Sequence, residues 1–555
     1  MSQSTQMEIP EPSSGFMGPM MTDLYQFTMC YAYWKLGVSE KTATFELFFR
    51  KNPFKGEFTV FAGMDEIVKF LHHFKIREDD IDYLKTVMPD AEDGFWQYLR
   101  DLDLSGVTLR GVKAGTPVFP KIPLITVTGP LGAVQLLETP LLNGVNYPSL
   151  LVTNAARMRL IAGDHVKMLE FGLRRAQGPD GAMSASRYAV LGGFDGTSNV
   201  LAGKMFGLAI SGTHAHSFVS AFSGLSDLNS RAVAAPQTPS GTYVGKGEAE
   251  AESSVHSDFV GNVLRIRQQL GLTSTNPAEL AAFIAYAQAF PSGFLALVDT
   301  YDTLLSGVPN YLCVAAALVE AGYTPRGIRL DSGDLAHLSN ESRRQFKEAA
   351  LALDMPVLAE GNIVASNDIN EDVLKALNEQ GHNITVFGIG TKLVTCSAQP
   401  ALGCVFKLVE LDGSPRIKLS QDKIKMTIPY KKRVFRLWGR SGYSVVDLMV
   451  KEGDTVPEPG SCVECYHPFD EQRRCKLYPT KVEDLHMDIM TDGRVVYTPP
   501  STTESGTYCR EQVRALRPDH TRTDQPSPYK VSVTQPLFEA VRDLWVSNSV
   551  VQEVE

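Results

Sequence analysis

A pattern repeated between residues 149 and 401 constrains the fold more than any other feature of this chain. Short apolar runs end there in Gly, Asp, Ser or Thr, and helix-length segments such as 149–161, 311–321 and 341–353 separate several of them. Apolar strands that alternate with helices predict a parallel sheet covered on both faces, closed here into an α/β barrel. The runs are VKMLEFG, YAVLGGFDG, GLAISGTHAH, FLALVDTYDT, GIRLDSGD, MPVLAEGN and ITVFGIGT.

The rest of the chain is organised around this segment. At 555 residues the chain exceeds what a single hydrophobic core usually supports. We expect a disordered lead over 1–19, an N-terminal α+β domain over 20–148, the barrel over 149–401 and a β-rich C-terminal domain over 402–555. The Pro/Gly/Ala/Glu-rich stretch 226–257 interrupts the barrel pattern and predicts a mobile insertion.

Within the N-terminal domain, local signals predict one helix and two strands. Thr22 or Asp23 is placed to cap a helix that begins at Leu24. Aromatic and β-branched residues over 44–49 and 58–61 favour strands.

Composition excludes several classes of protein. The net charge of −10 argues against a general binder of nucleic acid or of membrane surfaces. The apolar tract 130–152 is broken by charged, amide and Pro residues, so we do not expect it to span a membrane. Residues 1–15 lack the basic start and apolar core of a signal peptide, and eight scattered cysteines suit a reducing compartment. These features predict a cytosolic protein.

The segment Ser211–Ser217 carries the strongest chemical signal. It follows the apolar run 206–210, which we expect to be a strand, and it contains Thr213, His214 and His216. An imidazole accepts and releases a proton or a phosphoryl group near neutral pH. Taken alone, a His in such a turn is more often a solvated or capping residue than a nucleophile.

A second group of polar residues follows the run that begins at Gly327. Asp331 and Asp334 are three residues apart across a Ser-Gly turn. Two such carboxylates could orient Mg²⁺ or bind sugar hydroxyls. The alternative is that one of them caps the following helix, and Asp334 is well placed to do so.

Two further turns could bind anions. Gly388, Gly390 and Thr391 follow an apolar run, where backbone N–H groups and a hydroxyl can face a phosphate, although many tight turns share this pattern. Arg174 and Arg175 follow another run and could clamp a phosphate or remain solvated on the surface. Small and hydroxyl residues over 192–199 allow close approach to the backbone, and a structural turn explains them equally well.

Together these segments resemble the nicotinate phosphoribosyltransferase family. The resemblance covers roughly residues 20–450, and its motifs occur in the family's order. They are TDLYQFTM (22–29), FELFFR (45–50), QLLETPLLN (135–143), TNAARMRLIAG (153–163), EFGLRRAQGPDG (170–181), GGFDGTSNVLAG (192–203), GTHAHSFV (212–219), RLDSGDL (329–335) and VFGIGTKLVTC (386–396).

The resemblance implies a type II phosphoribosyltransferase-like irregular α/β barrel and a specific reaction. Nicotinate and 5-phosphoribosyl 1-pyrophosphate would give nicotinate mononucleotide and pyrophosphate, with ATP as co-substrate and Mg²⁺ or Mn²⁺ as cofactor. This reaction is the first step of NAD biosynthesis from nicotinate, the Preiss–Handler pathway. A homodimer with shared active sites is implied in the same way.

Residue roles are implied position by position. His216 matches the phosphorylated His of the family's GTxAHS motif, whereas His214 stands at its variable position. Thr213 and Arg329 match positions that contact nicotinate, and Tyr25 would stack on the pyridine ring, although without the resemblance Tyr25 would be assigned to a buried helix face.

The remaining matched positions concern the phosphoribosyl substrate. Thr391, Gly388 and Gly390 match its phosphate site, and Arg174 lies in a motif expected to meet pyrophosphate. Asp331 and Asp334 are candidates for ribose or metal contact. The metal ligands themselves are not identified from the sequence.

Alternative functions stay open at this point. Nicotinamide and quinolinate phosphoribosyltransferases share the barrel, although the TDLYQ start and the GTHAHS segment favour nicotinate. Outside enzymes, the alternative is a catalytically silent phosphoribosyl-binding sensor, and the retention of His216, Arg329, both aspartates and GIGT argues against it. In the C-terminal region, Cys462, Cys465, His467 and Cys475 are ligand types suited to Zn²⁺, but the spacing is incomplete and favours reduced, unpaired thiols.

Overall fold

The computed structural model describes residues 9–236, 255–420 and 422–549, which form two compact units. Unit 1 comprises the chain up to Arg157, residues 187–193 and the chain from Cys396 onward. Unit 2 comprises residues 158–186 and 194–395.

A seven-stranded sheet forms the centre of unit 1. Its strand β1 is buried at every residue after the first, and it pairs antiparallel with β14 on one side and β5 on the other. Strands from the two ends of the chain therefore share one sheet. The two units of the structure thus do not follow the domain boundaries expected at residues 148 and 401. In sheet order the strands are β15 (Ser414–Pro415), β14 (Cys404–Leu411), β1 (Thr42–Phe49), β5 (Ile125–Pro130), β3 (Thr108–Val112), β21 (His486–Thr491) and β22 (Arg494–Val495).

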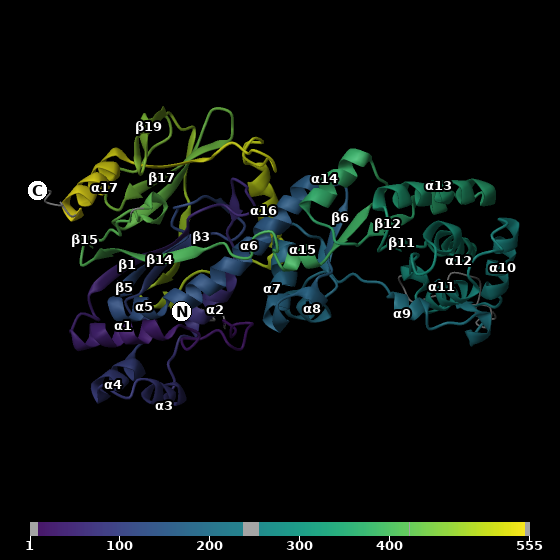
Figure 1. Ribbon diagram of the computed structural model, residues 1–555, viewed down its shortest axis with the longest axis horizontal. Coiled ribbons are helices and arrows are strands. Elements are labelled where there is room, and N and C mark those ends of the chain that lie inside the picture. Colours follow the sequence, from purple (N-terminus) through teal and green to yellow (C-terminus); the bar gives the residue numbers. More distant parts are fainter. Residues whose placement is uncertain (1–8, 237–254, 421, 550–555) are drawn as a thin grey trace, which may run out of the picture. The chain divides into compact units, whose positions relative to one another are not determined.

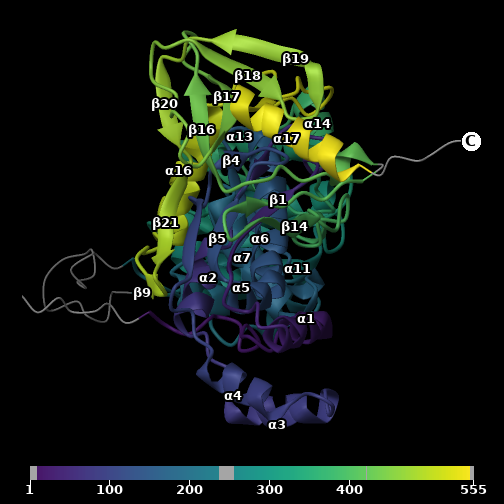
Figure 2. The same cartoon turned by 90° about the vertical axis from the view of Figure 1, so that its left-hand side faces the viewer.

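A second, six-stranded sheet completes the C-terminal part of unit 1. Its apolar residues form a cluster around Phe435, Leu448 and Val463, and helix α17 (Gln535–Asn548) packs against β17 and β18 (Figure 2). In sheet order the strands are β19 (Asp470–Leu477), β18 (Val463–His467), β23 (Lys530–Val533), β17 (Ser444–Lys451), β16 (Lys432–Trp438) and β20 (Lys481–Asp484).

The other elements of unit 1 include a small sheet and several helices. Helices α3 and α4 pack together below α1 in the view of Figure 1. These elements are β2 (Thr59–Val60), β4 (Pro117–Val118), α1 (Leu24–Lys35), α2 (Met64–His72), α3 (Glu78–Val87), α4 (Asp93–Asp101), α5 (Leu131–Leu136) and α16 (Thr502–Arg514). Helices α6 (Glu138–Ala162) and α7 (Gly178–Leu191) contribute residues to both units.

Unit 2 is built on six strands that are all parallel to their neighbours. The structure therefore confirms the predicted α/β class. The sheet edges are extended by a parallel bridge between Thr197 and Ile210 and by a hydrogen bond from the backbone N–H of Leu297 to His214 Nε2. In sheet order the strands are β10 (Leu295–Leu297), β11 (Gly327–Leu330), β12 (Asn362–Ala365), β13 (Val386–Ile389), β6 (Lys167–Glu170) and β7 (Gly196–Thr197).

Helices surround the parallel strands, and α13 contacts β11 (Figure 1). The segment Thr303–Glu320, which includes α12, is apolar enough to cross a membrane, but 72% of it is buried. Because α12 packs against α10, α11 and α13, its apolar surface serves the core of unit 2. The helices are α8 (Val200–Phe206), α9 (His216–Val219), α10 (Phe259–Gln269), α11 (Pro277–Ala289), α12 (Val308–Glu320), α13 (Leu335–Leu353), α14 (Glu371–Gln380) and α15 (Thr391–Val394).

Three of the apolar runs were assigned wrongly as strands. The residues YAVL end helix α7, and the strand is the next segment, β7. Residues 356–360 form a 3₁₀ helix, and the strand again follows as β12. In the run 206–210, Phe206 ends α8 and Ile210 makes only an isolated bridge. A short apolar run does not distinguish a buried strand from a buried helical turn, which explains all three errors.

Two segments expected to lack order are partly described. Ser13 donates to Glu66 through both its N–H and its hydroxyl, and the carbonyl of Ile9 lies 2.8 Å from His73 Nε2, so residues 9–19 contact α2. The ends of the predicted insertion pair as β8 (Val233–Ala234) and β9 (Val255–His256). Residues 1–8 and 237–254 lie outside the described residues.

Candidate active site

Polar side chains from neighbouring strands of unit 2 meet at the C-terminal edge of its sheet. Asp299 follows β10 and Asp331 follows β11, and Asp299 Oδ2 accepts hydrogen bonds from the Asp331 N–H at 3.1 Å and the Ser332 hydroxyl at 2.5 Å. Ser366, which follows β12, donates to Asp331 Oδ1 at 2.6 Å. Three strand ends are thus joined around two carboxylates, at the edge where such folds place their chemistry.

His216 is the first residue of α9 and faces these carboxylates. Its Nδ1 lies 3.0 Å from Thr300 Oγ1, and its Nε2 lies 3.7 Å from Asp299 Oδ1 and 3.8 Å from Asp331 Oδ2. The imidazole is 44% exposed, so Nε2 is accessible to a ligand. An Nδ1–H that donates to Thr300 leaves the Nε2 lone pair free to act as a nucleophile.

Asp299 is a deeply buried charge at this edge. Its side chain is only 3% exposed, and Oδ1 has no hydrogen-bond partner among the described residues. A buried carboxylate oxygen without a partner is costly unless a proton donor or a cation satisfies it. The Oδ1 atom therefore marks the point where a protonated His216 or a bound cation would be stabilised.

His214 lies two residues away in a different environment. It is buried, its Nε2 accepts a hydrogen bond from the N–H of Leu297, and its ring contacts Phe218 and Tyr286. Burial lowers the pKa of His214 to about 4. Because a backbone N–H donates to its Nε2 lone pair, His214 is a neutral structural residue bound to the end of β10.

Arg329 lies on β11 and reaches Thr213, one residue before His214. Its Nη1 donates to Thr213 Oγ1 at 2.7 Å, while the buried Nε has no partner among the described residues. Burial lowers the pKa of Arg329, the nearby charges of Asp331 and Asp299 oppose this effect, and Arg174 adds to it. A desolvated guanidinium with a free donor suits a planar carboxylate ligand.

The loop after β6 brings Arg174 within electrostatic reach of Arg329. Arg174 is exposed in a short 3₁₀ turn over residues 173–175. Glu170, at the end of β6, is fully buried and accepts hydrogen bonds from the Gly172 N–H and from the hydroxyls of Ser186 and Thr197. Glu170 therefore holds the turn that presents Arg174.

The Gly-rich turn after β13 lies against the same loop. A Cβ on Gly388 would approach the ring of Phe171 to 2.4 Å, and a Cβ on Gly390 would lie 3.1 Å from the Phe171 carbonyl oxygen. Both glycines are therefore required for the close packing of two strand ends. Thr391 follows as the first residue of α15 and is partly exposed.

Two other predicted site residues have different positions. Asp334 is the N-cap of α13 and accepts a hydrogen bond from the His337 N–H at 3.0 Å, as the capping alternative predicts. Tyr25 lies on α1 of unit 1, where its hydroxyl donates to Glu138 Oε1 at 3.2 Å and its side chain is 46% exposed. His216, Asp331, Thr213, Arg329 and Arg174 all lie at the strand ends of unit 2.

Sequence reasoning missed three members of this cluster: Asp299, Thr300 and Ser366. The first two stand at the polar end of the run FLALVDTYDT, so that run already contained the signal. Ser366 was missed because the run before it was assigned to the wrong segment.

Comparison with known proteins identifies the family. Models of the nicotinate phosphoribosyltransferase N-terminal and C-terminal domains match residues 20–146 and 431–541. A nicotinate phosphoribosyltransferase of Dictyostelium discoideum is 49% identical over 98% of this chain and 91% of its own length. This chain belongs to the nicotinate phosphoribosyltransferase family. That assignment confirms the resemblance carried by the sequence motifs, and the family is one of enzymes.

Human relatives agree in sequence and in structure. The human nicotinate phosphoribosyltransferase is 44% identical over 96% of this chain and 97% of its own length. A crystal structure of human nicotinic acid phosphoribosyltransferase matches with a TM-score of 0.82 and 41% identity, covering 94% of this chain and 99% of that chain. The match confirms the predicted type II phosphoribosyltransferase fold, with an irregular α/β barrel, an N-terminal α+β part and a β-rich C-terminal part.

Proposed function

We propose that this enzyme forms nicotinate mononucleotide and pyrophosphate from nicotinate and 5-phosphoribosyl 1-pyrophosphate in the cytosol, with ATP hydrolysis coupled through a phosphohistidine at His216. The observation that carries the proposal is the accessible Nε2 of His216, which faces Asp299 and Asp331 at the strand ends. Family membership supports the overall reaction, and the geometry around His216 supports the coupling.

The coupling step begins with Nε2 of His216. Its lone pair attacks the γ-phosphorus of ATP, an N–P bond forms, the bond to the bridging oxygen breaks and ADP leaves. Thr300 would hold the Nδ1–H during the attack and so keep Nε2 unprotonated. Hydrolysis of this N–P bond after product formation would return His216 to its starting state.

A divalent cation fits the charges at this point. A phosphoryl group on Nε2 would bring negative charge beside two carboxylates whose oxygens lie 3.7 and 3.8 Å away. Mg²⁺ is commonly held by one or two carboxylates together with substrate phosphates, so Asp299 and Asp331 would hold it here. When bound, Mg²⁺ or Mn²⁺ would neutralise the charge of the phosphates.

Nicotinate would bind at Arg329. The Nε donor of Arg329 has no hydrogen-bond partner among the described residues and would donate to the carboxylate, while Thr213 beside it holds the guanidinium by accepting from Nη1. Nicotinamide lacks the negative charge that this guanidinium would pair with. In a homodimer with shared active sites, the half-exposed ring of Tyr25 would stack on the pyridine from the partner subunit.

The phosphoribosyl substrate would occupy the remaining strand ends. Arg174 would pair with the pyrophosphate, and Thr391 with the turn through Gly388 and Gly390 would receive the 5-phosphate. Loss of pyrophosphate develops positive charge at C1 of the sugar, and the pyridine nitrogen attacks that carbon. Asp334 would contact a ribose hydroxyl with the carboxylate oxygen that does not cap α13. Catalysis of this kind depends mainly on positioning and electrostatics.

Product formation with two pyridines tests the proposal. Purified enzyme, phosphoribosyl pyrophosphate and Mg²⁺ are incubated with nicotinate or nicotinamide, each with and without ATP. We expect mononucleotide from nicotinate, formed faster with ATP. Product from nicotinamide alone would transfer the assignment to the related enzyme, and no product from either pyridine would favour a binding protein.

A further inference from the structure

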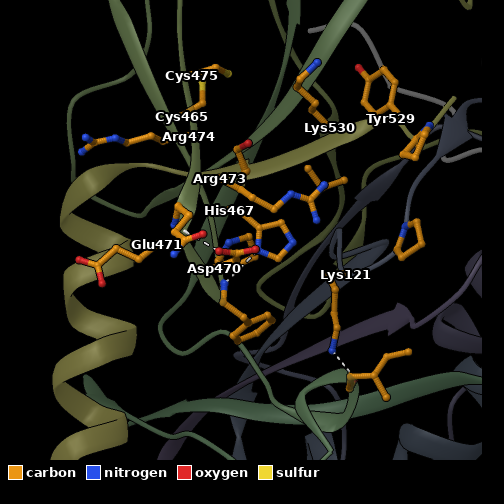
Figure 3. Close-up of a pocket in the computed structure, with 18 of the residues that line it drawn as sticks. Lys121, Cys465, His467, Asp470, Glu471, Arg473, Arg474, Cys475, Tyr529 and Lys530 are labelled. Atoms are coloured by element: carbon orange, nitrogen blue, oxygen red, sulfur yellow. Dashed lines mark hydrogen bonds between the residues drawn. The ribbon is translucent and has the colours of Figure 1, made fainter.

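A cavity in the C-terminal sheet of unit 1 contains two cysteines that the proposed function does not use. The cavity has a volume of about 1240 Å³ and is lined by residues of β18, β19 and β23 together with Lys121 and Tyr529 (Figure 3). Ligand pockets usually measure about 300–1,000 Å³, so this one can admit a small peptide. Cys465 and Cys475 both line it.

The two cysteines face each other across antiparallel strands. Cys465 on β18 is the direct register partner of Cys475 on β19. Directly opposed residues in such a pair have Cα atoms about 4.5–5.5 Å apart, which lies within the range that a disulfide bridges. Among the described residues no three His, Cys, Asp or Glu side chains converge as metal ligands, so a two-thiol arrangement describes this group better than a zinc site.

The two thiols differ in access. Cys465 is buried within the apolar cluster of the second sheet, whereas Cys475 is partly exposed at the edge of that cluster. The neighbouring Cys465 and the positive charge of Lys530 lower the pKa of Cys475, whereas the neighbouring Cys475 and burial raise the pKa of Cys465. A thiolate that is accessible and a neighbouring thiol that is protected form an attacking and resolving pair.

The charges around the cavity favour an anionic reagent near the thiols. Lys530 acts on Cys475, and Lys530 and Arg473 both line the cavity. In Figure 3 the thiols lie at the upper end of the view, and the labelled carboxylates Asp470 and Glu471 lie lower.

We propose that Cys475 and Cys465 are a thiol–disulfide exchange site for a low-molecular-weight anionic disulfide of the oxidised glutathione class. The Cys475 thiolate attacks one sulfur of the small disulfide, which forms a mixed disulfide and releases one thiolate. Cys465 then loses its proton and attacks the Cys475 sulfur, which forms the Cys465–Cys475 bond and releases the second thiolate. Two protein sulfurs are oxidised and the small disulfide is reduced to two thiols, which take up the proton released by Cys465 and one proton from solvent, since Cys475 reacts as the thiolate.

Non-reducing peptide mapping after incubation with oxidised glutathione tests this site. The wild-type enzyme should lose two thiols, form a Cys465–Cys475 bond and retain no glutathione. Cys465→Ser should trap glutathione on Cys475, because the resolving thiol is gone, and Cys475→Ser should slow the reaction about tenfold or more. Cys462→Ser is the matched control, since Cys462 is the exposed cysteine nearby, and it should behave like the wild type.

Two further measurements keep the test independent of how the variants fold. In the wild type, iodoacetamide should label Cys475 faster than Cys462 at pH values between about 6 and 7, where a thiolate of lowered pKa is already populated. Oxidised glutathione should also react faster than the cationic disulfide cystamine. Glutathione attached only to Cys462, equal labelling of the two cysteines or a faster reaction with cystamine would each overturn the proposal. Mononucleotide synthesis is not part of these readouts, so the proposed function can fail without affecting this result.

Discussion

Two groups of charged residues, one in each unit, show opposite ways of placing charge inside this protein. In unit 1, Arg436 Nε and Nη2 donate to the two oxygens of Asp447 at 2.8 Å each, and Tyr529 and the Pro117 carbonyl complete the group. In unit 2, Asp299 Oδ1 and Arg329 Nε are buried without hydrogen-bond partners among the described residues. In the first group the charged atoms hydrogen-bond to one another and to neighbouring groups. In the second group, one carboxylate oxygen and one guanidinium N–H remain available to hydrogen-bond a ligand.

This difference supports the assignment of the first group to structure and of the second to the proposed ligand site. A buried ion pair with all its hydrogen bonds made contributes to a defined fold and has nothing to offer a substrate. Buried polar atoms left without partners reduce stability, and they occur at functional sites because a ligand supplies the missing interaction. The comparison predicts that substitutions in the two groups affect different measurements.

The largest effect is expected from His216→Ala. Without the Nε2 nucleophile no phosphoenzyme forms, so the ratio of synthesis rates with and without ATP should fall to about 1. Slow synthesis without coupling should remain, because the pyridine and phosphoribosyl contacts are intact. Initial rates measured with and without ATP give this ratio. A variant that keeps its stimulation by ATP would remove His216 from the coupling step.

Arg329→Ala should have the next largest effect. Loss of a charged hydrogen-bonded contact costs about 1.5–3 kcal/mol, so the KM for nicotinate should rise by about 10- to 150-fold, while the KM for ATP changes little. Arg326→Ala is the matched control, because Arg326 lies just before the other end of β11 and donates to the Ser292 carbonyl. An unchanged KM for nicotinate in Arg329→Ala would place the pyridine elsewhere.

Arg436→Met should reduce stability without changing substrate affinity. Removing one partner of a buried ion pair leaves Asp447 uncompensated and costs about 3–5 kcal/mol of unfolding free energy. Urea unfolding should show this loss, while the KM for nicotinate of the folded enzyme stays at the wild-type value. The double variant Arg436→Met/Asp447→Leu should recover part of the stability. If it were no more stable than Arg436→Met, the loss would not come from the unpaired charge.

The smallest effect is expected from His214→Gln, which keeps a hydrogen-bond acceptor for the N–H of Leu297. The pKa of His214 is lowered to about 4 in the folded state, so between that value and the ordinary pKa of about 6.5 the unfolded chain binds a proton that the folded chain does not. Stability therefore falls as the pH falls through this window. The thermal midpoint of the variant should decline less steeply there than that of the wild type, and stimulation by ATP should persist. A slope equal to that of the wild type would contradict the burial of a neutral His214.

Much of the fold was predictable because its signal is local. Runs of apolar residues ending in polar ones predicted the parallel sheet of unit 2, and the aromatic content of β1 predicted that strand. The pairing of β1 with β14 joins residues more than 350 positions apart, as in Ala43 and Leu411, and no local pattern carries that information. The same limit explains why the sheet shared by the two ends of the chain was not expected.

The site was predictable where its residues belong to one continuous motif. Thr213, His216 and Arg329 lie in such motifs, and all three lie at the strand ends of unit 2. Asp299 was missed because its role depends on the pairing of β10 with β11. From the residues alone His214 and His216 were not separated, since residues two apart in an extended segment point the same way, and only the family motif favoured His216. Because helix α9 begins at His216, the two histidine side chains do not point the same way.

The position of the phosphoryl group tests the account most directly. The enzyme is incubated with ATP and Mg²⁺, digested under alkaline conditions that preserve the N–P bond, and mapped by mass spectrometry. We expect phosphate on His216 and none on His214. Phosphate on His214, or synthesis stimulated by ATP with neither histidine modified, would contradict the assignment of the strand-end group in unit 2 as the coupling site.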